Sequence, residues 1–220
     1  MTQAHMTSTR TRVITLDPIN PERSVLSEAA AVLKASELVI APTETRYGLL
    51  ALATSEVAVQ QIYLAKGRGF SQPLAVFLRD CADIGKWATV VPRARALAET
   101  FLPGPLTLVL PSSAELPAPI VGSGWLGIRV SPSPVIAGLL ELLDEPLTAT
   151  SANLSGGTDV ETAAQARDQL GQTVTIYLDG GRLDGPVSTV VRCSDDGMEL
   201  LREGAISAER VQAVAEGSRG

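Results

Sequence analysis

Two cations separated by a single glycine are the first residues in the chain whose types and spacing suggest chemistry. Lys66 and Arg68 flank Gly67, where an apolar-patterned segment ends. Arginine makes planar, bidentate contacts with phosphate oxygens and lysine supplies a compact charge, so the two could converge on a phosphate chain. The plainer interpretation is two solvated cations, which are favourable near the C-terminal end of a helix. The motif alone leaves both interpretations open.

Small polar residues fill a second segment, Thr150 to Gly157, which reads TSANLSGG and follows a short apolar run typical of a buried strand. Ser151 and Asn153 offer a hydroxyl and an amide. The glycines are expected to leave backbone N–H groups accessible, and such a loop can wrap around an anion. An ordinary strand-to-helix loop with capping residues has a similar composition.

A third segment, Pro42 to Leu49, reads PTETRYGL and also follows a predicted buried strand. It presents the hydroxyls of Thr43 and Thr45 and the carboxylate of Glu44 at a strand end, where open α/β sheets bind ligands. The alternative is a polar turn in which the two threonines make local backbone hydrogen bonds.

An arginine within an apolar run is a further candidate. Arg129 stands in the segment Gly127 to Val130, which is predicted to be a strand. Arginine is seldom buried without a partner, so we expect either a carboxylate ligand or an acidic side chain beside it. Ser188 and Arg202 lie across a predicted hairpin and would add another hydroxyl and another cation.

Several classes of catalytic site are excluded by the rest of the sequence. The one histidine is His5, near the N-terminus, so neither a Ser-His-Asp or Cys-His group nor a histidine-based metal site can be built. No G-x-x-x-x-G-K-[ST] motif is present. Gly122, Gly124 and Gly127 fit the pattern G-x-G-x-x-G, but a strand-like run follows them instead of the helix that a dinucleotide site needs.

Composition predicts one globular domain. The chain has 220 residues, of which 45% are hydrophobic, and a net charge of -6. This acidic balance lacks the broad basic surface of a nucleic-acid-binding protein, although a small basic pocket for an anion is compatible with it. Cys81 and Cys193 are far apart in the sequence and are expected to be reduced thiols.

Strand-like and helix-like segments alternate along the chain, which predicts a single α/β domain with a mixed sheet. Ser55 or its neighbour Thr54 is expected to cap a helix that has Val57, Ile62 and Leu64 on its apolar face and ends at Gly67. Asp159 is a candidate cap for a later helix. A hairpin is predicted around Asp196-Gly197.

The N-terminal segment is expected to be a disordered leader, residues 1–11, before a domain at 12–216. It has no apolar core of a secretory signal, and no part of the chain approaches the roughly 18 apolar residues of a membrane helix. The cytoplasm is the expected location.

Taken together, these segments resemble the YrdC-like threonylcarbamoyl-adenylate synthases. The matching segments run in order from about Val13 to Ile206: PTETRYGL, IYLAKGR with PLAVFL, FLPGPLTLVLP, GIRV, PLTATSANLSG, the DGG at Asp179, STVV and LREGAI. Each is weak alone, but eight in the right order are specific. The implied fold is an open, twisted mixed α/β sheet with flanking helices and a large basic cavity. Because the chain ends soon after LREGAI, the resemblance is to the short, single-domain bacterial form.

The resemblance also implies roles for individual residues. The family's catalytic tetrad is matched by Lys66, Arg68, Ser151 and Asn153. Contacts with substrate threonine are expected from Thr45, Arg129 and Ser188, with Arg129 on the carboxylate. Contacts with ATP are expected from Arg68, Ser151 and Arg202.

The implied activity is that of an L-threonylcarbamoyladenylate synthase, a nucleotidyltransferase that makes threonylcarbamoyl-AMP and pyrophosphate from L-threonine, bicarbonate and ATP for tRNA threonylcarbamoyladenosine modification. The carbamate that attacks phosphorus is already anionic, so no histidine base is needed, and positioning and charge neutralisation suffice. Mg²⁺ is expected to arrive on the ATP phosphates, with no metal site in the protein. The implied partners are proteins that pass the threonylcarbamoyl group to tRNA, with any RNA binding weak and no membrane contact.

Some positions depart from the family pattern. Arg46, Leu50, Gln72, Phe77 and Leu102 replace residues that are common in relatives. Two alternatives remain open: a catalytically different paralogue that binds RNA or a nucleotide, and an enzyme that adenylates another carbamoyl substrate, as in hydrogenase maturation.

Overall fold

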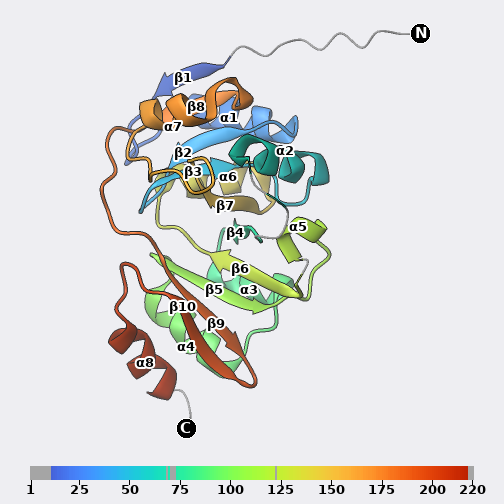
Figure 1. Cartoon of the computed structure of the whole chain (residues 1–220), viewed down its shortest axis with the longest axis vertical. Coiled ribbons are helices and arrows are strands. Elements are labelled where there is room, and N and C mark those ends of the chain that lie inside the picture. Colours follow the sequence, from blue (N-terminus) through green and yellow to red (C-terminus); the bar gives the residue numbers. More distant parts are fainter. Residues whose placement is uncertain (1–10, 68, 70–72, 122, 218–220) are drawn as a thin grey trace, which may run out of the picture.

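A computed structural model of the protein describes residues 11–67, 69, 73–121 and 123–217. Within these residues, ten strands form one sheet in the order β1-β8-β2-β3-β7-β4-β6-β5-β9-β10 (Figure 1). Parallel pairs such as β1 with β8 and antiparallel pairs such as β2 with β3 both occur. The prediction of an open mixed sheet flanked by helices is therefore confirmed. The expected leader at 1–11 lies, apart from Thr11, outside the described residues.

The strands are β1 (Arg12–Thr15), β2 (Val39–Pro42), β3 (Tyr47–Leu50), β4 (Ala75–Phe77), β5 (Leu106–Pro111), β6 (Trp125–Arg129), β7 (Leu147–Ser151), β8 (Ile176–Asp179), β9 (Thr189–Ser194) and β10 (Gly197–Arg202). The α-helices are α1 (Arg23–Lys34), α2 (Glu56–Lys66), α3 (Ile84–Trp87), α4 (Pro92–Phe101), α5 (Ala118–Val121), α6 (Pro134–Leu143), α7 (Ala163–Leu170) and α8 (Ala208–Gly217). Two short 3₁₀ turns are Cys81–Asp83 and Gly171–Thr173. In the described part of the chain, no helix combines the length and apolar composition needed to cross a membrane.

Strand β7 joins two halves of the sheet. It pairs antiparallel with β3, where Thr150 lies opposite Leu49, and with β4, where Ala149 lies opposite Ala75. The first half, made of β1, β8, β2 and β3, is covered on one face by α1 and α6 and on the other by α2 and α7 (Figure 1). Both faces are apolar, which is typical of a sheet between helix layers.

The second half, made of β4, β6, β5, β9 and β10, is covered on one face by α4 and its neighbours, and on the other face Phe77 of β4 packs with residues of α6. Alternate residues of β5 and β6, among them Leu108 and Ile128, are fully buried in the core against α4 and its neighbours. Their sequence neighbours Thr107, Val109 and Gly127 point to the opposite face because side chains alternate along a strand. This opposite face forms the floor of a cavity.

Helix α2 has the predicted ends but a different buried face. The Ser55 hydroxyl accepts a hydrogen bond from the Ala58 N–H, and Gly67 ends the helix in the left-handed conformation, as predicted. Ile62 is buried as predicted, but Val57 and Leu64 are 61% and 78% exposed, so these two members of the predicted apolar face are wrong. The buried stripe consists of Ala58, Val59, Ile62, Tyr63, Ala65 and Lys66. A charged residue therefore stands on the inner face of this helix.

The predicted Asp159 cap is wrong and the hairpin is confirmed. Thr162, and not Asp159, caps α7 through a capping box with Gln165. Helix α1 begins after Glu22 without a side-chain cap, although Asn20 precedes a proline in the manner of a cap. Strands β9 and β10 pair antiparallel on either side of the turn at 195–196.

We predict that Gly127→Val destabilises the protein, because Gly127 allows β4 and β6 to approach closely. A Cβ at position 127 would lie 2.9 Å from the Ala75 Cβ in the opposite strand. Such overpacking costs about 1–3 kcal/mol of unfolding free energy, measurable by urea denaturation. Gly85→Ala is the control, since its added Cβ meets no atom within 4 Å among the described residues. Equal stabilities of the two variants would contradict the proposed close approach.

Candidate active site

A cavity of about 450 Å³ lies where the two halves of the sheet meet. Its floor is the open face of β4, β5, β6 and β9, and its walls come from the turn after β2 and the end of β7. The charged residues among the described ones that line it are Arg46, Arg129, Arg202 and Asp159. Cations therefore outnumber acids along the wall, which favours an anionic ligand.

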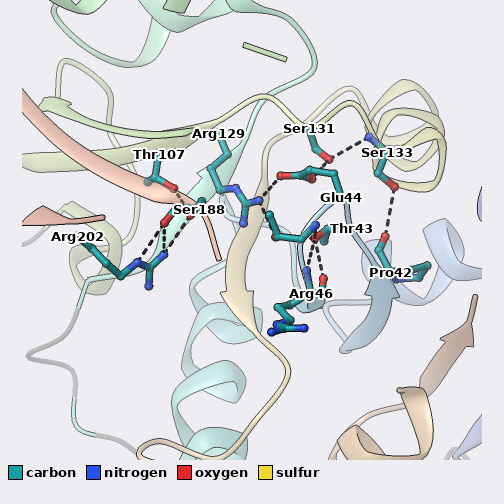
Figure 2. A network of polar contacts seen from close by, with 11 residues as sticks. Pro42, Thr43, Glu44, Arg46, Thr107, Arg129, Ser131, Ser133, Ser188 and Arg202 are labelled. Carbon is teal, nitrogen blue, oxygen red and sulfur yellow. Dashed lines mark hydrogen bonds and ion pairs between the residues drawn. The ribbon is translucent and has the colours of Figure 1, made fainter. Parts of the chain in front are cut away.

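The centre of the site is an ion pair between Arg129 on β6 and Glu44 in the turn after β2 (Figure 2). Both side chains are 12% exposed. Arg129 Nη2 also donates to Thr45 Oγ1 at 3.2 Å, and the guanidinium lies 4.8 Å from the centre of the Phe77 ring. The acidic partner expected for Arg129 is thus Glu44. Arg129 Nε is buried and has no partner among the described residues.

Glu44 is itself held from the far side. Ser131 Oγ donates to Glu44 Oε2 and accepts a 3.1 Å hydrogen bond from the Ser133 N–H. Ser133 Oγ in turn donates to the Pro42 carbonyl at 3.3 Å, so the chain of contacts returns to the end of β2 (Figure 2). The carboxylate is therefore fixed between Arg129 and Ser131.

Thr43 shapes the turn that carries Glu44 and Thr45. Its hydroxyl donates to the Arg46 carbonyl at 2.6 Å and accepts from the N–H groups of Thr45 at 3.1 Å and Arg46 at 3.2 Å. The local backbone role considered for Thr43 is thus the observed one. Thr45 keeps its hydroxyl at the cavity wall.

Ser188 and Arg202 are in direct contact, as their positions across the predicted hairpin suggested. Arg202 donates from Nε and Nη2 to the Ser188 carbonyl at 3.1 and 2.9 Å and from Nη2 to Ser188 Oγ at 3.1 Å (Figure 2). Thr107 Oγ1 lies 3.0 Å from Ser188 Oγ. Burial, and then the neighbouring charge of Arg129, lower the pKa of Arg202, while Asp159 opposes the shift. Thr107 is not among the predicted site residues. A lone threonine alternating with buried leucines in the segment LTLVLP nevertheless marks it as facing the cavity.

The described members of the predicted catalytic tetrad do not all line the cavity. Ser151 lines the cavity, whereas Lys66 and Asn153 are 3% and 7% exposed and lie outside its lining. Lys66 Nζ donates to Ser151 O at 2.5 Å, Asn153 O at 2.6 Å and Asn153 Oδ1 at 3.3 Å. Arg68 and Gln72 lie outside the described residues.

The loop after β7 does not present the accessible amides that its composition suggested. Its N–H groups donate within the protein: Ala152 to Tyr47 O, Leu154 to Gln169 Oε1, Ser155 to Lys66 O and Gly157 to Leu154 O. That expectation is therefore wrong for these four amides. The small residues instead let the loop fold tightly on itself and on α2.

An irregular segment between β8 and β9 covers the turn that carries Glu44. Arg46 Nη1 donates to the Leu183 carbonyl at 2.9 Å, and Tyr47 Oη donates to the Gly181 carbonyl at 2.6 Å. Burial raises the pKa of Tyr47 to about 12, so its hydroxyl remains a donor at neutral pH. Arg46, a departure from the family pattern, thus lines the cavity and also tethers this segment.

We predict that Glu44→Ala lowers the unfolding free energy by about 3 kcal/mol, because it leaves the largely buried Arg129 charge uncompensated. Glu141→Ala is the matched control. Glu141 pairs with Arg23, but their side chains are 66% and 77% exposed, so its loss is expected to cost about 1 kcal/mol or less. Urea denaturation measures both values, and a Glu44→Ala loss no larger than the control would contradict the structural role of the pair.

Comparisons with known proteins place the chain in one family. The family model of the Sua5, YciO and YrdC proteins, described as "Telomere recombination", matches residues 31–204. The Bacillus subtilis protein named threonylcarbamoyl-AMP synthase is 37% identical over 90% of this chain, which spans 58% of that protein's length. A Methanocaldococcus jannaschii protein named putative threonylcarbamoyl-AMP synthase is 33% identical over 92% of this chain and 97% of its own.

The fold also matches solved structures. The crystal structure of Pyrococcus abyssi Sua5 complexed with L-threonine superposes with a TM-score of 0.87 at 34% sequence identity. The match covers 93% of this chain and 61% of that chain. Since the family model covers most of the chain and the relatives exceed 30% identity over most of it, the protein belongs to the Sua5/YciO/YrdC family.

Proposed function

We propose that this protein is an L-threonylcarbamoyladenylate synthase, a nucleotidyltransferase that uses L-threonine, bicarbonate and ATP. The observation that carries the proposal is the cavity where Thr45, Arg129, Ser188 and Arg202 converge. The names of the relatives and the threonine in the Pyrococcus abyssi complex supply the substrate class.

Threonine binds, in this proposal, between the turn after β2 and the start of β9. Thr45 and Ser188 line the cavity together with Arg129, whose guanidinium is assigned to the threonine carboxylate from the family motif. Glu44 neutralises part of the Arg129 charge and holds the guanidinium in place. A small hydroxy amino acid is then selected because its hydroxyl pairs with the hydroxyls of the site. An amino acid without a hydroxyl would leave polar groups of the site unpaired, which costs binding free energy.

ATP binds along the cationic walls in the same proposal. Arg202 and Ser151 line the cavity, and Arg68 is assigned to the phosphates from the family motif. Arg46 adds a further positive charge to the wall. Arginine suits this task because its planar fork matches phosphate oxygens and its charge persists at any physiological pH.

The reaction needs orientation more than proton transfer. The threonine amine and bicarbonate form a carbamate with loss of water. A carbamate oxygen then bonds to the α-phosphorus of ATP as the bond to the pyrophosphate oxygen breaks. Charge develops on the phosphate oxygens, and arginines preorganised in the cavity would stabilise it. The single histidine, His5, lies far in sequence from the site residues, which fits a reaction without an imidazole base.

Magnesium is proposed to enter with the ATP phosphates. No group of three or more candidate ligand residues occurs in the part of the chain that the structure describes. Of the charged residues named above as lining the cavity, Asp159 is the one carboxylate. One carboxylate fits a cation that is bound mainly through phosphates and water. When bound, Mg²⁺ would supply charge neutralisation. The product would pass to proteins that transfer the threonylcarbamoyl group to tRNA, and a cytoplasmic location is proposed with them.

The activity is tested by pyrophosphate release from ATP, Mg²⁺ and bicarbonate, with and without L-threonine. We expect threonine-dependent release in the wild type and a loss of about 100-fold or more in kcat for Arg202→Ala or Arg68→Ala, as for removal of a preorganised donor. Arg23→Ala, an exposed arginine on α1, is the control and should match the wild type. Pyrophosphate release that does not depend on threonine would contradict the proposal. Release with carbamoyl phosphate in place of threonine and bicarbonate would instead support the alternative of an enzyme that adenylates another carbamoyl substrate.

A further inference from the structure

Lys66 is a buried cation at the end of a helix that borders the site. It is the last residue of α2 and lies on the inner stripe of that helix, next to Ile62 and Tyr63. Its side chain is shielded, with 3% of the residue exposed. A lysine is seldom buried to this degree without firm hydrogen-bond partners, so its ammonium group must have a defined structural or chemical role.

The ammonium group meets three oxygen atoms of one loop. Lys66 Nζ lies 2.5 Å from the carbonyl of Ser151, 2.6 Å from the carbonyl of Asn153 and 3.3 Å from Asn153 Oδ1. An ammonium donates N–H bonds in three directions, and each of these three oxygens lies within hydrogen-bond distance of it. If the ammonium bound a phosphate instead, the two backbone carbonyls would lose their hydrogen bonds from Lys66. Buried carbonyls without a hydrogen bond destabilise a protein.

The loop returns contacts to the same residue. The Ser155 N–H donates to the Lys66 carbonyl at 3.0 Å. Asn153 links the two sides, since Oδ1 accepts from Ser151 Oγ at 2.5 Å and Nδ2 donates to the Gly157 carbonyl at 3.0 Å. The end of α2 and the loop after β7 therefore form one hydrogen-bonded unit, of which Ser151 is the member that lines the cavity.

We propose that Lys66 is a positioning residue that acts through the loop, and that Ser151 touches the substrate in its place. Its ammonium holds the carbonyls of Ser151 and Asn153 and thereby fixes where the Ser151 hydroxyl faces the cavity. The catalytic part of this proposal rests on the synthase activity proposed above. Its structural part concerns the protein without ligands and can be tested independently.

The first test is hydrogen exchange of the ligand-free protein. In Lys66→Met we expect the amides of Leu154 and Ser155 to exchange about tenfold faster or more, while amides of β5 and β9 remain unchanged. Lys34→Met is a matched control, because Lys34 also ends a helix and donates to a carbonyl, that of Leu142 at 3.2 Å, but is exposed. Unchanged exchange at Leu154 and Ser155 in a folded Lys66→Met variant would overturn the proposal, whether or not the protein makes threonylcarbamoyl-AMP.

The second test compares activities. If Lys66 acts through Ser151, the losses of activity caused by the two substitutions are not additive. The kcat/KM of the double variant Lys66→Met/Ser151→Ala should therefore lie within about threefold of that of Lys66→Met. The kcat/KM of Lys66→Arg should be reduced about 100-fold, like that of Lys66→Met, because a planar guanidinium cannot meet three converging oxygens. Misplacing a group that contacts the substrate has an effect of this size. Wild-type activity in Lys66→Arg, or additive losses in the double variant, would instead make Lys66 a direct phosphate ligand. Lys66→Arg retains the charge and also serves if Lys66→Met does not fold.

Discussion

A guanidinium on the open face of a sheet needs a counter-charge, and the position of that counter-charge sets the geometry of the whole site. Arg129 belongs to the second half of the sheet and Glu44 to a turn of the first half. Their ion pair therefore connects the two halves across the cavity, in addition to the backbone pairing through β7. Because Ser131 binds the other carboxylate oxygen, neither member can move without breaking several polar contacts. The pair thus gives the cavity a fixed width as well as a charge pattern.

Around this pair, the site divides into residues that face the cavity and residues that hold them. Thr45, Ser188, Ser151 and Arg202 are of the first kind. Glu44, Thr43, Lys66 and Asn153 are largely of the second, since their polar atoms contact the protein itself. Sites that align reactants without forming a covalent bond to the enzyme depend on such support, because a small displacement of a contacting group lowers the reaction rate strongly. The number of supporting contacts here is consistent with catalysis by positioning.

Sequence patterns predicted the sheet class, the hairpin of β9 and β10 and the segments that meet at the cavity, because strand alternation and glycine signals are local. They do not give answers that depend on the register of a helix or on distant partners. Gly67 and Arg68 suggest that Lys66 contacts a phosphate chain, which stays a prediction, whereas the stripe of Ala58, Val59, Ile62 and Tyr63 places Lys66 inward. The choice of Glu44 as the partner of Arg129 likewise required two segments 85 residues apart to be placed together. For Arg68, outside the described residues, the assignment stays a prediction.

The position of β8 in the sheet has a consequence for synthesis of the chain. β8 lies between β1 and β2, with Ile14 opposite Leu178 and Ile40 opposite Tyr177. During translation, β1 therefore has no neighbour in the sheet, and β2 has an open edge, until β8 leaves the ribosome, on the order of 10 to 30 s later at typical elongation rates. An unpaired strand edge is a template for pairing with another chain. The nascent protein is consequently exposed to aggregation until β8 is made, however stable the finished fold is.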